Sequence, residues 1–152
     1  MQFQPSDFSQ SRPAPIAVEQ RLLSAAGRLA GGVLLAAIAA LWLSLLTWSV
    51  TDPSLTHATS GATRNLMGAL GAIVSDLMLQ TFGLAAIVIL VVPMFWAIRM
   101  VAGATRMSRS QLMFYPIAAF LAAGALAALP VAVGWPLHHG FGGILGDTVF
   151  AL

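Results

Sequence analysis

The chain has 152 residues, of which 59% are hydrophobic and only 8% are charged, and its formal net charge is +2. Soluble domains carry about 25% charged residues, so this composition excludes an ordinary water-soluble surface and predicts a membrane protein. The sequence has no cysteine and no lysine. It therefore holds no disulfide framework and no P-loop, whose motif needs a lysine to reach the nucleotide phosphates. Its arginines are scattered and form no DNA-binding face.

Residues 1–28 are polar and rich in proline, which is typical of a mobile cytoplasmic tail. From Ile16 onward, apolar residues alternate with Glu19, Arg21 and Arg28, and this pattern fits an amphipathic lead-in helix on the membrane surface. A signal peptide is excluded because the apolar run is too long and no small-residue cleavage site follows.

The first predicted span covers residues 29–48. Twenty residues without a charge rise about 30 Å as a helix, which is enough to cross the hydrocarbon core. Small residues recur every four positions along it and predict a smooth face for helix packing: Gly32, Ala36, Ala40 and Ser44. Trp48 at its far end suits the membrane–water interface.

The second predicted span covers residues 70–98 and follows a polar loop with a turn at Asp52-Pro53-Ser54. Residues 65–98 would measure about 51 Å as one helix, which exceeds the membrane thickness. We therefore expect the first turns to lie outside the membrane or the helix to tilt, and the glycines at 68 and 71 favour a break there. Pro93 removes the backbone bond to Ile89 and predicts a kink.

The third predicted span covers residues 112–130 and follows an arginine-rich loop. Ser108 and Gln111 match a capping box at its start. A second outer loop follows from Val131 to Phe141, and residues 142–152 become apolar again. Eleven residues make about half a span, so we expect the chain to end inside its fourth helix, as a truncated product or fragment would.

The arginines predict the orientation. The segments before and between the spans carry three, one, three and no arginines in chain order, and positively charged segments stay in the cytoplasm. The N-terminus and the loop from Arg99 to Gln111 are therefore expected inside, and the loops with Asp52 and Trp135 outside. The predicted fold is an all-α integral membrane bundle with three complete transmembrane helices, the start of a fourth and a cytoplasmic N-terminus.

Three segments carry a family resemblance: WSVTDPSLTHAT (residues 48–59), RNLMG (residues 64–68) and GAIVSDLMLQTFGLA (residues 71–85). They resemble the N-terminal membrane domain of the FtsK/SpoIIIE DNA translocases in its proteobacterial form. Weaker similarity extends the match to roughly residues 31–152, through Pro93, Trp96, Trp135, Pro136 and the GGILGD segment at residues 142–147.

The resemblance implies the septal membrane anchor of a cell-division DNA translocase in the bacterial inner membrane. Such a domain targets the protein to the septum, contacts membrane lipid and division-site proteins, and tethers a hexameric ATPase motor. That motor is absent from this chain. ATP with Mg²⁺, contact with DNA and assembly into a homo-oligomer through the motor would all belong to the missing part, so the chain itself is not expected to be an enzyme.

Five polar or turn-forming residues are candidate structural or partner contacts: Asp52, Pro53, Asn65, Asp76 and Gln80. Asp76 and Gln80 stand four residues apart on one helix face, near the outer side of the second span. An aspartate in a span faces protein or water, and we interpret this one as a polar contact at the interface or between helices. The alternative is a small transporter or channel subunit that uses Asp76 and Gln80, but the first and third spans supply no further ionisable partner.

No catalytic, cofactor-binding or metal residues are expected. The histidines at 57, 138 and 139 with Asp147 suggest a metal site, but zinc needs three or four ligands in fixed geometry and adjacent histidines rarely point the same way. Asp52, Ser54 and His57 suggest a hydrolytic set, yet no G-x-S-x-G frames a nucleophile. An intramembrane enzyme is disfavoured for the same reason.

The predicted topology is testable because the chain has no cysteine of its own. Single cysteines at Ser60 and Ser110 should react differently with a membrane-impermeant thiol reagent added to intact cells. Ser60→Cys should be labelled from outside and Ser110→Cys only after lysis. The reverse labelling pattern would overturn the orientation.

Overall fold

The computed structural model describes residues 14–55, 61–104, 108–131, 133–137 and 139–151, and within them every regular element is an α-helix. The elements are α1 (Ala14–Leu46), α2 (Gly68–Phe82), α3 (Ala85–Val101), α4 (Arg109–Ala127) and α5 (Gly143–Phe150). Two of them are long and apolar enough to cross a membrane, α1 from Val18 to Leu46 and α4, and α2 with α3 qualifies as a bent pair. The predicted all-α membrane fold is confirmed.

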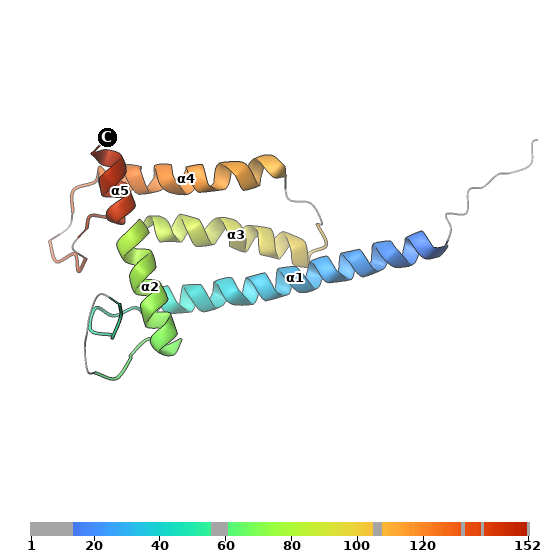
Figure 1. Ribbon diagram of the computed structural model, residues 1–152, viewed down its shortest axis with the longest axis horizontal. Coiled ribbons are helices and arrows are strands. Elements are labelled where there is room, and N and C mark those ends of the chain that lie inside the picture. The colour runs from blue at the N-terminus through green and yellow to red at the C-terminus, as the bar shows by residue number, and fades with distance from the viewer. Residues whose placement is uncertain (1–13, 56–60, 105–107, 132, 138, 152) are drawn as a thin grey trace, which may run out of the picture.

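Three helices run side by side and form the body of the molecule (Figure 1). α3 lies between α1 and α4 and runs in the opposite direction to both, while α2 and α5 cross one end of the group. The middle helix also carries most of the core, with five of the nine buried hydrophobic residues of the described chain: Ala85, Ala86, Leu90, Trp96 and Ala97. Elsewhere large apolar side chains are exposed on every helix, as expected of surfaces that face lipid.

The predicted lead-in helix and first span form one continuous helix in α1. Its 33 residues correspond to about 50 Å at 1.5 Å per residue, and its N-terminal turns project beyond the other helices (Figure 1). α1 packs closely against α3 at Gly31, where an added Cβ would lie 2.7 Å from the Cβ of Met100. Gly32 has nothing within 4 Å, and both Gly32 and Ala36 are exposed. The predicted small-residue stripe is therefore not the face that packs against α3, although its last member, Ser44, is buried against α2.

The second predicted span is not a single helix. α2 and α3 meet at an angle of 112°, with Gly83 and Leu84 between them. The sequence predicts a break near Gly68 and Gly71, but the sharp turn lies at Gly83. Gly83 has φ +57° and ψ −137°, a conformation that side-chain-bearing residues rarely adopt, so the chain can turn there and not at an ordinary residue.

The start of α5 fills the corner at Gly83. The backbone N–H of Leu84 donates to the carbonyl of Phe141 at 2.8 Å, so the donor exposed by the break is satisfied. A Cβ on Gly83 would collide with that same carbonyl, and one on Gly143 would lie 2.6 Å from the nitrogen of Gly83. Both glycines are needed because two backbones pass within contact distance.

In the bent pair of α2 and α3, α3 is the part that runs alongside α1 and α4 (Figure 1), so it is the part placed to cross the membrane. Its 17 residues rise about 26 Å, close to the thickness of the hydrocarbon core. If α3 follows the membrane normal, an angle of 112° places α2 close to the membrane plane, across the end where α1 finishes (Figure 1). By the arginine distribution this is the outer end.

α3 continues through Pro93 without ending. Proline has no N–H, so the carbonyl of Ile89 loses its helical partner, and an unsatisfied group in lipid costs several kcal/mol. The hydroxyl of Tyr115 on α4 donates to this carbonyl at 2.5 Å, and the Tyr115 ring meets Trp96 edge-on with centroids 5.3 Å apart. A bond that α3 cannot make for itself thus fixes α4 against it.

The start of α4 lacks the predicted capping box. Ser108 is the N-cap of α4 but makes no side-chain capping bond; its Oγ lies 2.6 Å from the Oγ of Ser110 instead. The predicted capping box is therefore not formed.

At the other end of α4, a Cβ on Gly142 or Gly146 would collide with the carbonyl of Ala123, so α4 and α5 cross almost backbone to backbone.

The glycine corner predicts a sharp contrast between two Gly→Ala substitutions. Gly83→Ala should lower the free energy of unfolding by about 1–3 kcal/mol, the usual cost of forcing a side chain into such a backbone conformation, with the collision against Phe141 added. Gly32→Ala, in the open middle of α1, should raise helix stability by up to about 1 kcal/mol. Denaturant titration of the purified chain in detergent micelles would measure both, and equal effects would contradict the corner.

Candidate functional site

Asp52 fastens the first outer loop. Its side chain is buried, at 3% exposure, and its two carboxylate oxygens each accept a bond of 2.9 Å from the backbone N–H groups of Arg64 and Asn65. A carboxylate that accepts from two successive amides makes strong charge-assisted bonds. Asp52 therefore ties the beginning of the loop to its end, twelve and thirteen residues later.

Asn65 connects that loop to the helices below it. Its side-chain nitrogen donates to the carbonyl of Ser44 on α1 at 2.8 Å and lies 3.4 Å from the Oγ of Ser75 on α2. Its side-chain oxygen accepts from the N–H of Met67 at 3.0 Å, just before α2 begins. An amide that both donates and accepts can bridge such mixed partners, so Asn65 joins the loop, α1 and α2 at one buried point.

Two serines complete the junction of α1 and α2. The hydroxyl of Ser44 donates to the carbonyl of Gly71 at 2.5 Å, and that of Ser75 donates to the same carbonyl at 2.7 Å. Both serines are buried. A Cβ on Gly71 would lie 2.9 Å from the Ser44 hydroxyl, so the glycine is what lets the two helices come close enough for these bonds.

Asp76 lies on the same buried face of α2, at 3% exposure. The indole N–H of Trp48 donates to one carboxylate oxygen at 3.4 Å, and the amide of Gln80 donates to the other at 3.0 Å. Asp76 and Gln80 are thus in contact, as their spacing of four residues suggests. The pair faces the end of α1 rather than lipid, which is where a carboxylate in an apolar segment is tolerated.

The structure brings four of the five candidate residues, Asp52, Asn65, Asp76 and Gln80, to this end of the bundle. Two neighbouring sets of hydrogen bonds contain them, and together we call these sets the outer polar network: Ser44, Asp52, Asn65, Gly71 and Ser75 in one, and Trp48, Asp76 and Gln80 in the other. The fifth candidate, Pro53, is half-buried in the loop beside Asp52 and takes no part in this network. Sequence reasoning did not select Ser44 or Ser75 as site residues. In the sequence, Ser44 is the polar member of the small-residue series and Ser75 is the neighbour of Asp76, but neither feature is specific enough to predict a functional residue.

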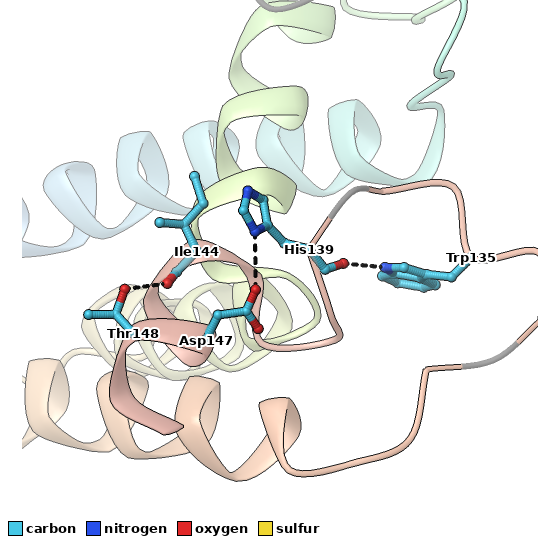
Figure 2. Close-up of polar contacts among 5 residues, drawn as sticks. All are labelled: Trp135, His139, Ile144, Asp147 and Thr148. Atoms are coloured by element: carbon cyan, nitrogen blue, oxygen red, sulfur yellow. Dashed lines mark hydrogen bonds and ion pairs between the residues drawn. The ribbon is translucent and has the colours of Figure 1, made fainter. Parts of the chain in front are cut away.

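The second outer loop is held against α5 by fewer and more exposed contacts (Figure 2). The indole N–H of Trp135 donates to the carbonyl of His139 at 2.9 Å, and the Trp135 ring meets Phe141 edge-on at 4.7 Å. The Nδ1 of His139 lies 3.1 Å from a carboxylate oxygen of Asp147. Both partners are about two-fifths exposed, and exposed pairs contribute about 0.2–1 kcal/mol.

The histidine hypotheses are only partly covered by the structure. His57 and His138 lie outside the described residues. Within the described residues, no group of three or more histidine or carboxylate side chains is placed to hold a metal ion. Ser54 and Asp52 lie in the same loop, but Asp52 uses both oxygens on backbone amides, an arrangement suited to fixing a loop rather than activating a nucleophile.

Comparison with known sequences decides the family. The sequence model described as the 4TM region of DNA translocase FtsK/SpoIIIE matches residues 24–152. The chain belongs to this family. Its membership accounts for the apolar helices and makes this chain the membrane region of an FtsK/SpoIIIE-type protein, spanning the bilayer several times. The resemblance carried by the segments around Asp52, Asn65 and Asp76 is thereby confirmed.

Curated relatives support the FtsK/SpoIIIE assignment. The DNA translocase FtsK of Agrobacterium fabrum (strain C58) is 41% identical over 123 residues, which are 80% of this chain and 14% of the relative. The proteins of the same name from Rhizobium meliloti (39% over 123 residues) and Mesorhizobium japonicum (40% over 128 residues) cover 80% and 83% of this chain. The chain spans only 14% of the length of each of these relatives. No solved structure matches significantly.

The buried carboxylate of Asp52 predicts a larger stability effect than an exposed one. Asp52→Ala leaves two amides without their acceptor and should lower the free energy of unfolding by about 1.5–3 kcal/mol, the range for bonds to charged groups. Asp147→Ala, which removes an exposed carboxylate on the same side, should cost about 0.2–1 kcal/mol. Thermal unfolding in detergent, monitored by helical circular dichroism, would compare them. A loss for Asp147→Ala as large as for Asp52→Ala would argue against the loop clamp.

Proposed function

We propose that this chain is the membrane anchor of a cell-division DNA translocase in the bacterial inner membrane. In this proposal it targets the protein to the division septum and tethers a cytoplasmic ATPase motor that assembles as a homo-oligomer. The observation that carries the proposal is the family match over residues 24–152 together with relatives named as DNA translocases, of whose length this chain covers 14%. Most of such a protein lies outside the membrane region.

The chemistry of the chain supports an anchor rather than a motor. No lysine is present, so the chain has no residue to fill the phosphate-binding position of a P-loop. ATP, Mg²⁺ and DNA would therefore be bound by other parts of the full-length protein. What this chain supplies is a set of membrane crossings with a polar network at their outer end.

The outer polar network suits a docking role. Bonds from Asp52 and Asn65 join the two ends of the first outer loop and hold them against α1 and α2, so these described ends are already fixed before a partner binds. Partners that change shape little on binding avoid the entropy cost of ordering. We infer that division-site proteins would contact this end of the bundle, where both outer loops meet α2 and α5.

The transporter alternative has less support. A proton or ion path needs several ionisable groups lined up through the membrane. Neither α3 nor α4 contains an acidic residue or a histidine. Asp76 uses both carboxylate oxygens on Trp48 and Gln80 at the outer end, so it anchors α2 rather than beginning a relay.

A domain exchange tests the proposal. In an FtsK from a related bacterium, the segment that aligns with this chain would be replaced by residues 1–152, so that the host's own residues continue from there to the motor, with a fluorescent protein attached. The hybrid should concentrate at the septum and support division. Gly83→Ala in the hybrid, which disrupts the corner, should reduce both, and Gly32→Ala should not. Uniform membrane fluorescence of the stable unsubstituted hybrid would reject septal targeting.

A further inference from the structure

A groove of about 460 Å³ lies between α3 and α4. Its walls are mainly apolar and come from residues that include Val91, Val92, Phe95 and Trp96 on α3, and Phe114 and Ala118 on α4. α1 contributes no lining residue, so the groove is not closed by the third long helix. Its volume lies in the range of sites that hold small apolar ligands.

The groove extends from the middle of α3, at Val91 to Trp96, along the first half of α4, at Gln111 to Ala118. Its α4 side therefore reaches the end of the bundle that carries the loop between α3 and α4. The arginine distribution places this loop in the cytoplasm. The groove therefore opens into the cytoplasmic leaflet, where biological membranes concentrate negatively charged lipids.

Polar groups gather at the cytoplasmic mouth of the groove. Arg99 stands in the last turn of α3, three and four residues after Trp96 and Phe95, and so on the same helix face as these two lining residues. Gln111 lines the groove from the first turn of α4. The mouth thus combines a cation with an amide, while the wall behind it is aromatic and aliphatic.

The charge of Arg99 is not neutralised within the described chain. Arg99 is exposed, no described residue forms an ion pair with it, and neither α3 nor α4 contains an acidic residue. An arginine next to an apolar groove in a membrane has the chemistry to bind a phosphate that carries an acyl chain.

We propose that this groove binds an anionic phospholipid of the cytoplasmic leaflet. One acyl chain lies along the aromatic wall at Phe95, Trp96 and Phe114, and the phosphate is bound by Arg99 with Gln111. The proposal rests on the groove and on the inside position of Arg99, and it does not depend on septal targeting or on a motor. The competing occupant is a helix from a second copy of the chain. The α3 or α4 helix of a second copy would bring no carboxylate to Arg99, and the experiments below distinguish a second copy from lipid.

Native mass spectrometry of the purified chain tests the proposal. The chain would be released from mild detergent in the presence of phosphatidylglycerol and phosphatidylethanolamine with identical acyl chains. The unsubstituted chain should retain phosphatidylglycerol preferentially. Arg99→Gln should reduce this preference about fivefold, the order of magnitude that one arginine contributes near an anionic leaflet. Arg21→Gln removes the same charge from an exposed site on α1 and should leave the preference unchanged.

A second pair of variants tests the groove itself. Ala118→Trp fills the groove and should reduce retention of both lipids, whereas Ala125→Trp places the same side chain at an exposed position of α4 outside the groove and should not. If Ala118→Trp does not insert, a fluorescence experiment tests the groove instead. Brominated phosphatidylglycerol quenches tryptophan fluorescence on contact, and it should quench the unsubstituted chain more strongly than the Trp96→Phe variant, which lacks the ring in the groove.

Three results would overturn the proposal. Equal losses of the phosphatidylglycerol preference in Arg99→Gln and Arg21→Gln would mean that the lipid is attracted by the total positive charge of the chain and not by a specific site. Lipid retention unchanged by Ala118→Trp would show that the groove does not hold the lipid, and loss of a dimer from the native mass spectra of the same variant would assign the groove to a second copy. Quenching by brominated phosphatidylglycerol that does not change with Trp96→Phe would place the acyl chains elsewhere.

Discussion

Backbone groups inside a bilayer must find partners within the protein, and the corner at Gly83 is where this chain meets that requirement most sharply. A helix that breaks in an apolar segment exposes donors and acceptors. Here the carbonyl of Phe141 accepts from the backbone N–H of Leu84, and glycines on the two sides of the contact, Gly83 and Gly143, let the backbones approach. Because the break is satisfied in this way, α2 can lie across the end of the bundle and α3 can begin at the right depth to cross.

The same requirement explains the side chains that join the helices. Tyr115 bonds the carbonyl that Pro93 leaves free, and the serines at 44 and 75 share the carbonyl of Gly71. In lipid there is little hydrophobic gain when apolar helices associate, so close packing and hydrogen bonds must hold them together. The helix contacts described above accordingly each contain a glycine or a hydrogen bond between the two elements.

Hydropathy was enough to predict the helical class and the presence of apolar helices in the regions of α1 and α4, whereas the orientation inferred from the arginines stays a prediction. The spacing of Asp76 and Gln80 was enough to predict that they share a helix face. The corner was not predictable, because a glycine inside an apolar run is compatible with an unbroken helix. Its partner, Phe141, lies far away in the sequence and leaves no local pattern at Gly83.

Other details failed for the same physical reason. Pro93 predicts that the carbonyl of Ile89 lacks its helical hydrogen bond, but the sequence does not predict that the hydroxyl of Tyr115 donates to it. Asp52 looks like a local turn residue, yet its carboxylate serves amides at the far end of the loop. Ser108 and Gln111 have the spacing of a capping box, but Ser108 finds Ser110 instead. Local periodicity is encoded in neighbouring residues, whereas these contacts depend on which elements meet.

The continuity of α1 has a mechanical consequence. One unbroken helix runs from Ala14 to Leu46, and its outer end bears Ser44, which is bonded to α2 and to Asn65. α1 also packs closely against α3 at Gly31. Because no break interrupts the helix, its N-terminal turns and the Ser44 junction belong to one rigid element, and a displacement of either end is transmitted along the helix to the other.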